Sequence, residues 1–248
     1  MTRLITKIVR KIKHFFVKPI EIFVFHKVSD MYDSNYGGIE DWTNTEVFKK
    51  NIKYLQQCYE FISLDTAVVR LKNDRFRWKN YAVLTTDDGY RMNLDILSWL
   101  NENHIPTTVF LSTQYLDGQS YDHWFDEVWK SKTTEEINQL LEGMYIHYDD
   151  LSLLDKDNIS VALHGYGHDL VAQMQEDTFR AYVKTAEAQL DDKIKLSPYY
   201  AYTWGKHSRI TDSVLNELGL IPLYCDGNTN YQFDGVLHRK SIDNKIFL

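Results

Sequence analysis

The sequence has only two cysteines, Cys58 and Cys225, among its 248 residues. Two cysteines allow at most one internal disulfide, so neither a disulfide framework nor a cysteine-based zinc site is indicated. A reducing compartment is the simpler expectation. The four prolines leave little room for linkers, and no internal repeat or low-complexity tract is present. We therefore expect one folded domain.

Basic residues are also fewer than acidic residues. The chain has 28 Lys and Arg against 35 Asp and Glu, a formal net charge of -7. Because nucleic-acid binding depends on clustered Lys and Arg, this balance argues against a DNA or RNA partner. Aromatic residues are plentiful instead, with 6 Trp and 17 Tyr. Most of them are expected in the core or as ordinary surface residues, but flat aromatic faces also bind sugar rings through their apolar sides.

The first twenty residues contain no long hydrophobic run. Six basic residues precede any acidic one, and apolar residues recur at helical spacing, which predicts a basic amphipathic helix over residues 1–20. Charges interrupt its apolar face, so it resembles neither a signal peptide nor the span of about 20 apolar residues that crosses a membrane. Two interpretations fit: a cytoplasmic protein in peripheral contact with the anionic inner face of a membrane, or a terminal helix packed on the domain.

Strand and helix patterns alternate along residues 21–248, which we expect to form the catalytic domain. Strands are predicted at residues 21–28, 61–64, 81–86, 107–112, 159–163, 199–204, 221–225 and 236–242. Helices are predicted at residues 43–57, from Asp65, at 92–103, at 178–190 with Asp177 as cap, and at 211–218 ended by Gly219. Residues 114–158 are expected to form an insertion that contains a helix stopped by Gly143. The order predicts an α/β fold: an irregular or incomplete (β/α) barrel of seven to eight mostly parallel strands, with active groups after the strand C-termini.

Two adjacent carboxylates follow the predicted strand at 81–86. Asp87, Asp88 and Gly89 lie between this strand and an amphipathic helix pattern. Neighbouring carboxylates repel each other unless a cation, a shared proton or solvent absorbs the charge, and with a metal one can be a ligand while the other stays ionised as a base. The alternative is an ordinary turn, because Asp-Gly is a frequent turn dipeptide. The pair alone does not decide between these interpretations.

Two histidines follow the predicted strand at 159–163. His164 lies at its end and His168 comes four positions later, with glycines between them that disfavour a helix. Histidines on a loop are usually polar surface. Here, however, both pairs follow strands, and a parallel barrel would bring them to one face. A carboxylate and two imidazoles would hold a divalent cation and leave coordination positions open.

These segments resemble a known family. TTDDGY (residues 85–90) looks like the TFDDGY motif of polysaccharide deacetylases, carbohydrate esterase family 4, and HGYGH (164–168) is similar to that family's H-x-x-x-H motif. FVFHKVSD (23–30) resembles the YHxVSD segment of a branch that includes poly-N-acetylglucosamine deacetylases. The agreement extends over roughly residues 21–243. The resemblance implies a metal-dependent hydrolase that removes N-acetyl groups from an amino sugar in a polysaccharide, a glycan or a lipid-linked precursor.

The resemblance also implies roles for individual residues. Asp87 corresponds to the general base, and Asp88, His164 and His168 to the metal ligands. Zn²⁺ is the default cation for this ligand set, and Co²⁺ and Ni²⁺ are chemically acceptable. His26 corresponds to the general acid of the branch. The competing acid is His238, although Arg239 beside it is the residue that matches the branch's closing strand.

The chain departs from the family at YAYTWG (200–205), where an FAYPYG-like segment is typical. We expect Tyr90, Tyr202 and Trp204 to contact the substrate, with Trp204 either stacking on a sugar or offering its backbone N–H to the oxyanion. No clear counterpart of the family's D-x-W segment is found. The WFDEVW stretch (124–129) of the insertion either covers the site or packs on the barrel.

Several alternative functions fit parts of this pattern. The same site could hydrolyse O-acetyl esters, or the fold could serve a catalytically weak carbohydrate-binding protein. A glycosidase is disfavoured because Asp87 and Asp88 are sequence neighbours whose side chains diverge, and the two histidines would have no role. A non-heme iron oxygenase uses the same ligand types, but its common scaffold is an antiparallel jelly roll. The sequence does not distinguish the sugar or the oligomeric state.

Overall fold

The computed structural model describes residues 17–74 and 76–247. The predicted basic helix of residues 1–20 lies outside this range except for its last residues. Val17 already forms a β-bridge with Arg77, next to the start of the first strand. Within the described residues, no helix is both long enough and apolar enough to cross a membrane.

Within residues 17–74 and 76–247, nine strands form one sheet that almost closes on itself. They are β1 (Ile20–Phe25), β4 (Glu60–Phe61), β5 (Tyr81–Thr86), β6 (Thr107–Ser112), β7 (Ile159–Gly165), β8 (Leu196–Ala201), β9 (Ile221–Tyr224), β10 (Leu237–His238) and β11 (Lys240–Ser241). The order is β10-β9-β8-β7-β6-β5-β1-β11, with β4 beside β5, and every pairing is parallel. The prediction of an irregular (β/α) barrel is thereby confirmed.

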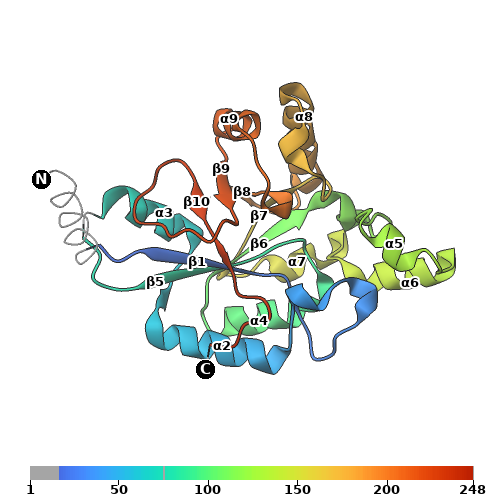
Figure 1. The fold of residues 1–248 in the computed structure, drawn as a ribbon, viewed down its shortest axis with the longest axis horizontal. Coiled ribbons are helices and arrows are strands. Elements are labelled where there is room, and N and C mark those ends of the chain that lie inside the picture. Colours follow the sequence, from blue (N-terminus) through green and yellow to red (C-terminus); the bar gives the residue numbers. More distant parts are fainter. Residues whose placement is uncertain (1–16, 75, 248) are drawn as a thin grey trace, which may run out of the picture.

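A single residue separates the two strands that close the barrel. β10 pairs with β9, β11 pairs with β1, and Arg239 lies between them. The predicted strand 236–242 is therefore two short strands. We call residues 239–243 the closing segment. It brings the end of the described chain back beside its first strand (Figure 1).

Helices cover the outside of the sheet. They are α2 (Thr45–Cys58), α3 (Leu64–Asn73), α4 (Leu94–Glu102), α5 (Phe125–Trp129), α6 (Thr134–Met144), α7 (Leu151–Leu154), α8 (Glu176–Leu190) and α9 (Arg209–Glu217). In Figure 1, α2 and α4 lie on one side of the strands and α8 and α9 on the other, while α5 and α6 of the insertion project at one end. A two-stranded pair, β2 (Lys27–Val28) and β3 (Trp42–Thr43), stands apart from the barrel.

The helix faces follow from residue spacing. In α2, Phe48, Ile52 and Leu55 are buried at intervals of four and three residues, which places them on one stripe. The side chain of Asn44 caps the first turn by accepting hydrogen bonds from two backbone N–H groups. The helix therefore begins where the polar cluster of the sequence predicted it.

Other helix ends differ from the predictions. Ser63, not Asp65, caps α3, and α8 begins at Glu176, so that Asp177 lies in its first turn. The helix dipole favours an acidic residue anywhere in the first turn. The sequence therefore does not show whether such an aspartate is the cap residue or lies inside the helix. Gly143 does not stop α6, which continues to Met144.

Two predicted strands also end earlier than expected. The strand at 61–64 ends at Phe61, because the following residues already cap and begin α3. The strand at 199–204 ends at Ala201. After it the chain makes a tight turn in which Trp204 has a φ of 58°.

Alternate residues of the strands enter two separate cores. The barrel interior contains the apolar residues Ile22, Val83, Phe110, Ala162, Ala201, Leu223 and Leu237. The layer between sheet and helices contains Phe25, Leu84, Val109, Leu111, Leu163 and the buried faces of α2, α4, α8 and α9. Burial of each such Val, Leu, Ile or Phe side chain contributes about 1.5–3 kcal/mol. The two cores fix the strand ends, and with them the residues that follow.

Candidate active site

The C-terminal ends of four strand segments meet at one edge of the barrel. His26 follows β1, Asp87 and Asp88 follow β5, His164 is the next-to-last residue of β7, and Arg239 lies between β10 and β11. Because all these strands are parallel, their C-terminal ends are on the same face. A cleft of about 300 Å³ opens there. It is lined by all the candidate site residues of the sequence except His238: His26, Asp87, Asp88, Tyr90, His164, His168, Tyr202, Trp204 and Arg239.

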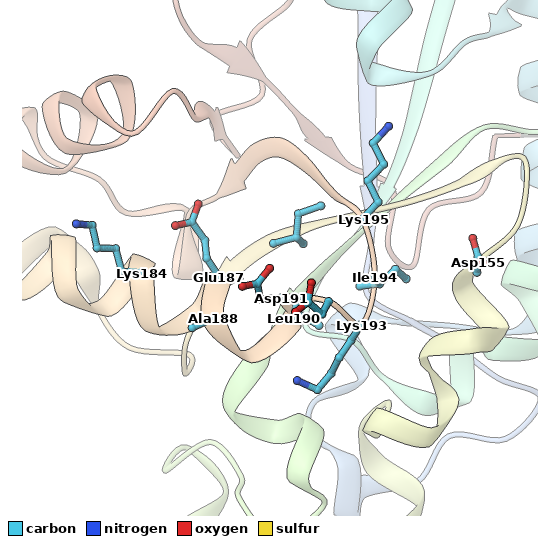
Figure 2. A pocket seen from close by; sticks show the side chains of 11 residues that line it. Asp155, Lys184, Glu187, Ala188, Leu190, Asp191, Lys193, Ile194 and Lys195 are labelled. Atoms are coloured by element: carbon cyan, nitrogen blue, oxygen red, sulfur yellow. The ribbon is translucent and has the colours of Figure 1, made fainter.

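A larger hollow lies elsewhere on the described surface. It measures about 820 Å³ and is formed around the end of α8 and the start of β8 (Figure 2). Its side chains carry charges of both signs, such as Lys184, Glu187 and Lys193, and it contains no histidine. It lies at the N-terminal end of β8, away from the face where the candidate residues meet. The candidate site is therefore identified by the residues that line the smaller cleft, not by the volume of the hollow.

A left-handed turn positions Asp88. Asp88 has a φ of 67° and Gly89 a φ of 74°. A Cβ atom at Gly89 would lie 2.7 Å from Leu111 Cδ2, so only glycine fits there without a shift. Asp88 holds a conformation that costs a non-glycine residue about 1–3 kcal/mol and that is concentrated at functional sites. The Asp-Gly pair is thus a turn and part of the site at once.

Asp88, His164 and His168 form a ligand cluster. Their candidate ligand atoms all lie within 4.8 Å of one another. The Nε2 atoms of His164 and His168 lie 3.1 and 3.5 Å from Asp88 Oδ1. That oxygen is buried and has no hydrogen-bond partner.

The other ring nitrogens of both histidines are already engaged. His164 Nδ1 lies 2.8 Å from the carbonyl oxygen of Ala201, which can only accept, so Nδ1 donates and Nε2 carries the lone pair. His168 Nδ1 lies 2.6 Å from Asp122 Oδ2. Two imidazole nitrogens oriented in this way beside an unpaired carboxylate oxygen are the donor set that a divalent cation requires. The three residues therefore fit a metal ion.

The charges of this cluster reinforce one another. Burial opposes the ionisation of Asp88. The imidazoles of His168 and His164 nevertheless hold the pKa of Asp88 well below its usual range. Burial likewise opposes protonation of His168, but Asp88 and Asp122 raise its pKa. A proton and a metal ion therefore compete for the same imidazole, and cation binding is expected to strengthen as the pH rises.

Arg239 holds the second carboxylate of the pair. Its Nη1 and Nη2 donate to the two oxygens of Asp87 at 2.7 and 2.8 Å, a bidentate pair in which both side chains are almost fully buried. Burial favours the neutral acid, but the guanidinium lowers the pKa of Asp87. Asp87 is thus kept ionised beside the candidate metal ligands.

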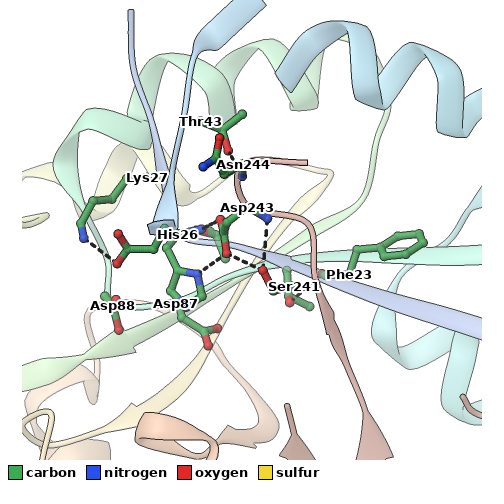
Figure 3. A network of polar contacts seen from close by, with 12 residues as sticks. Phe23, His26, Lys27, Thr43, Asp87, Asp88, Ser241, Asp243 and Asn244 are labelled. Atoms are coloured by element: carbon green, nitrogen blue, oxygen red, sulfur yellow. Dashed lines mark hydrogen bonds and ion pairs between the residues drawn. The ribbon is translucent and has the colours of Figure 1, made fainter. Parts of the chain in front are cut away.

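His26 has its own carboxylate partner, drawn in Figure 3. Its Nδ1 lies 2.7 Å from Asp243 Oδ2, and its backbone N–H donates to Asp243 Oδ1 at 2.8 Å. Ser241 Oγ also donates to Asp243, at 2.8 Å. Burial opposes protonation, but the Asp243 carboxylate raises the pKa of His26 to about 10. His26 is therefore a protonated imidazole at neutral pH.

His238, the competing candidate for the acid, does not line the cleft. Its Nδ1 instead bonds Asp226 at 2.9 Å. The geometry therefore favours His26.

The predicted substrate-contacting residues differ in exposure. Tyr90 is buried, stacks on Tyr145 and lies beneath the ammonium of Lys27. Tyr202 is buried and donates its hydroxyl hydrogen bond to Asp212. Trp204 is half exposed, and its indole N–H donates to the carbonyl of His168 at 3.1 Å. Trp204 thus presents the largest free surface of the three.

Sequence reasoning missed Asp122 and Asp243, the carboxylates behind the two histidines. Asp243 ends the VLHRKSID segment, where only His238 and Arg239 were considered. Asp122 belongs to the insertion, and nothing in its local pattern indicates that it reaches His168. The position of Asp243 directly after the predicted strand 236–242 was the only available signal for it.

Comparisons with known proteins agree with the fold. IcaB from Ammonifex degensii has a TM-score of 0.69 at 18% identity, covering 91% of this chain and 92% of that one. The deacetylase PplD of Streptococcus pyogenes has a TM-score of 0.71 at 15% identity, covering 91% and 93%. A de-N-acetylase from Aggregatibacter actinomycetemcomitans has a TM-score of 0.70 at 12% identity, covering 91% and 95%. These similarities show a shared fold.

A search of curated protein sequences finds no match. The sequence model of the polysaccharide deacetylase family, in contrast, matches residues 77–222, more than half of the chain. The matched range includes β5 to β8 with both the Asp pair and the His pair. The chain belongs to the polysaccharide deacetylase family.

Proposed function

We propose that this protein is a metal-dependent hydrolase that removes N-acetyl groups from an amino sugar of a glycan or glycan precursor. One observation carries the proposal: three residues that could hold a cation share one cleft with the carboxylate of Asp87 and the imidazole of His26. Asp88, His164 and His168 would hold the cation, most simply Zn²⁺, with Co²⁺ or Ni²⁺ as alternatives. A cation bound there would acidify water and polarise the acetyl carbonyl.

Asp87 is suited to act as the base. It adjoins the ligand Asp88, and its pKa is lowered by Arg239, so it is free of a proton at neutral pH. The bidentate contact uses one lone pair of each carboxylate oxygen and leaves the others able to accept a proton from the attacking water. Arg239 also fixes the direction in which the carboxylate points.

His26 is suited to act as the acid. An amine leaves an amide only after its nitrogen is protonated, so the reaction needs a donor that is charged when the substrate binds. The ion pair with Asp243 keeps His26 charged at neutral pH and orients its ring toward the cleft. This acid favours an N-acetyl substrate, while an O-acetyl ester remains the second candidate.

The sugar would lie against Trp204, with Tyr90 and Tyr202 in the buried part of the cleft lining. The half-exposed indole offers an apolar face to a pyranose ring. The backbone N–H of Trp204 is our candidate donor to the oxyanion, because a backbone donor does not depend on the side chain. The cytoplasmic location and the membrane contact of residues 1–20 also stay predictions.

The proposal is tested by acetate release from N-acetylated and O-acetylated amino-sugar oligomers, using the metal-loaded protein. Asp87→Asn and His164→Ala are expected to abolish release while the circular dichroism spectrum is retained. Asp226→Asn and His238→Ala are the matched controls, because this pair lies outside the cleft.

Each outcome has a distinct meaning. Release that survives Asp87→Asn would contradict the role of the base. Failure to bind any divalent cation would contradict the ligand assignment. One bound cation with no acetate from any substrate would favour a carbohydrate-binding protein that retains the fold.

A further inference from the structure

One ion pair in the wall of the cleft has no part in the proposed reaction. Lys27 and Asp41 both line the cleft, and Lys27 Nζ lies 2.8 Å from Asp41 Oδ2. We propose that this pair binds a hydroxyl group of the acetylated sugar ring and so determines which amino sugar the site accepts. The inference rests on the proposed function and specifies its substrate by the hydroxyl pattern of the ring.

Most other polar side chains of the cleft are already engaged. The candidate cation site and the ion pairs of the proposed base and acid account for the majority of them. The hydroxyl of Tyr202 donates to Asp212, and the indole N–H of Trp204 donates to a backbone carbonyl. A sugar ring brings several hydroxyl groups, and each one that loses water on binding needs a protein partner. Lys27 and Asp41 offer a donor and an acceptor that none of these contacts uses.

Both members of the pair have unused hydrogen-bonding capacity. The Lys27 ammonium has three N–H groups, of which one donates to Asp41, and it lies 4.6 Å from the centre of the Tyr90 ring. Asp41 Oδ1 is buried and has no hydrogen-bond partner, which is unfavourable for a carboxylate oxygen. The torsion that turns an aspartate carboxylate is broad, so this oxygen can rotate toward a ligand in the cleft. A hydroxyl group donates and accepts at once, and it therefore matches both members.

The two-stranded sheet that stands apart from the barrel positions the pair. β2 and β3 pair in a register that places Lys27 opposite Trp42, and Asp41 directly precedes Trp42. At Gly37, where φ is 111°, a Cβ atom would lie 3.0 Å from Lys27 Nζ. Glycine at this position therefore lets the loop between β2 and β3 pack closely against the ammonium. The ammonium is held in place before any ligand binds.

The environment of the pair favours an uncharged ligand group. The Lys27 side chain is 5% exposed and that of Asp41 is 34% exposed. A buried ion pair of this kind gives little net stability compared with apolar side chains of the same size, so stability alone does not explain it. The two charges cancel, and Glu40 beside them adds a negative charge to the lining. A carboxylate or phosphate of the ligand would be repelled, whereas a hydroxyl would not.

The first experiment removes the pair and the hydroxyl separately and together. Acetate release by the metal-loaded protein is measured with methyl N-acetylglucosaminide and with analogues that each lack one of its hydroxyl groups. We expect one analogue to lose about tenfold to hundredfold in kcat/KM, the value of a hydrogen bond to a charged group. Lys27→Met should cause a similar loss with the parent glycoside, mainly through KM, and little further loss with that analogue.

A second variant and a matched control accompany this experiment. Asp41→Ala should single out the same analogue as Lys27→Met, and circular dichroism checks that both variants fold. Lys79→Met and Glu60→Ala are the controls, because this ion pair of 2.7 Å is exposed and lies outside the cleft. An equal loss with the parent glycoside and all its analogues would overturn the recognition role, as would an unsubstituted protein that does not distinguish them.

A binding measurement separates the pair from the chemistry. In the Asp87→Asn background, calorimetry should show the same preference for one hydroxyl group, and Lys27→Met should remove that preference. Binding without a preference, or no binding of any glycoside, would overturn the role of the pair. A preference that Lys27→Met removes, without acetate release from any glycoside by the unsubstituted protein, would instead sustain the pair and contradict the proposed reaction.

Discussion

Two regions far apart in the sequence each place a carboxylate behind a histidine of the site. The closing segment contributes Asp243, 2.7 Å from Nδ1 of His26, and the insertion contributes Asp122, 2.6 Å from Nδ1 of His168. The pairs are alike, but Nε2 of His168 faces the carboxylate of Asp88, whereas His26 has no second ion pair among the described residues. The group on the other side of the imidazole ring, rather than the Asp–His pair itself, would therefore distinguish the proposed metal ligand His168 from the proposed proton donor His26.

The two regions also differ in what else they supply. The closing segment adds Arg239, which holds the proposed base Asp87, and the insertion adds Trp124 to the cleft lining. We therefore expect the closing segment to control proton transfer and the insertion to control the metal and the substrate. Variants in each region test this assignment, because a variant of the closing segment should change proton transfer and a variant of the insertion should change metal affinity.

The largest effect is expected from His26→Asn. Loss of a general acid costs about 10²–10⁴-fold in rate. The loss should appear for N-acetyl substrates but be far smaller for p-nitrophenyl acetate, because nitrophenolate leaves without protonation. Rates on both substrates are compared, together with cation affinity, which should not change. His238→Asn is the control, and an equal loss on both substrates would place His26 outside proton transfer.

Arg239→Met should have the next largest effect. Removing one partner of a buried ion pair lowers the free energy of unfolding by about 3–5 kcal/mol, because the other charge stays buried and unpaired. The double variant Asp87→Asn/Arg239→Met should recover part of that loss. Denaturant titration measures both. Lys240→Met, which breaks the more exposed pair with Glu21, should cost under about 1 kcal/mol; a similar cost for both single variants would contradict the buried pair.

Asp243→Asn tests the pH dependence of the closing segment. In the metal-free protein the pKa of His26 is expected near 10, and the variant should move it toward 6.5. A raised pKa means that the pair contributes stability in full below pH 6.5, and that this contribution is lost as the pH rises toward 10. NMR titration of the imidazole and unfolding at several pH values measure the two effects. An unchanged pKa in the variant would exclude Asp243 as its cause.

The smallest effect is expected from Asp122→Asn in the insertion. Loss of a carboxylate behind a metal-binding histidine weakens metal affinity about 10–100-fold. At saturating cation, acetate release should be largely restored, in contrast to the closing-segment variants. Cation titration by calorimetry measures the change, with Asp126→Asn as control because its side chain is exposed. An unchanged cation affinity in Asp122→Asn would contradict the assignment of metal binding to the insertion.

The sequence predicted the parts of the site that depend on local pattern. β5 and β6 have the predicted bounds because a run of buried residues ends at a turn or helix signal. The Asp and His pairs were predicted because each follows such a strand. The bonds of Asp122 and Asp243 join residues 46 and 217 positions apart. Only the closed barrel and the fold of the insertion create those contacts, so no local pattern predicts them.

Closure of the barrel by the closing segment affects the order in which the protein folds. β11 pairs with β1 although more than 200 residues separate them, which is a contact of very high sequence separation. Such contacts form late and slow folding, because loop closure must precede the gain from pairing. During synthesis the metal ligands would be complete while Asp87 and His26 still lacked Arg239 and Asp243. The ability to bind a cation is therefore expected to arise before the ability to catalyse, and the last strand to dock is the one that makes the site reactive.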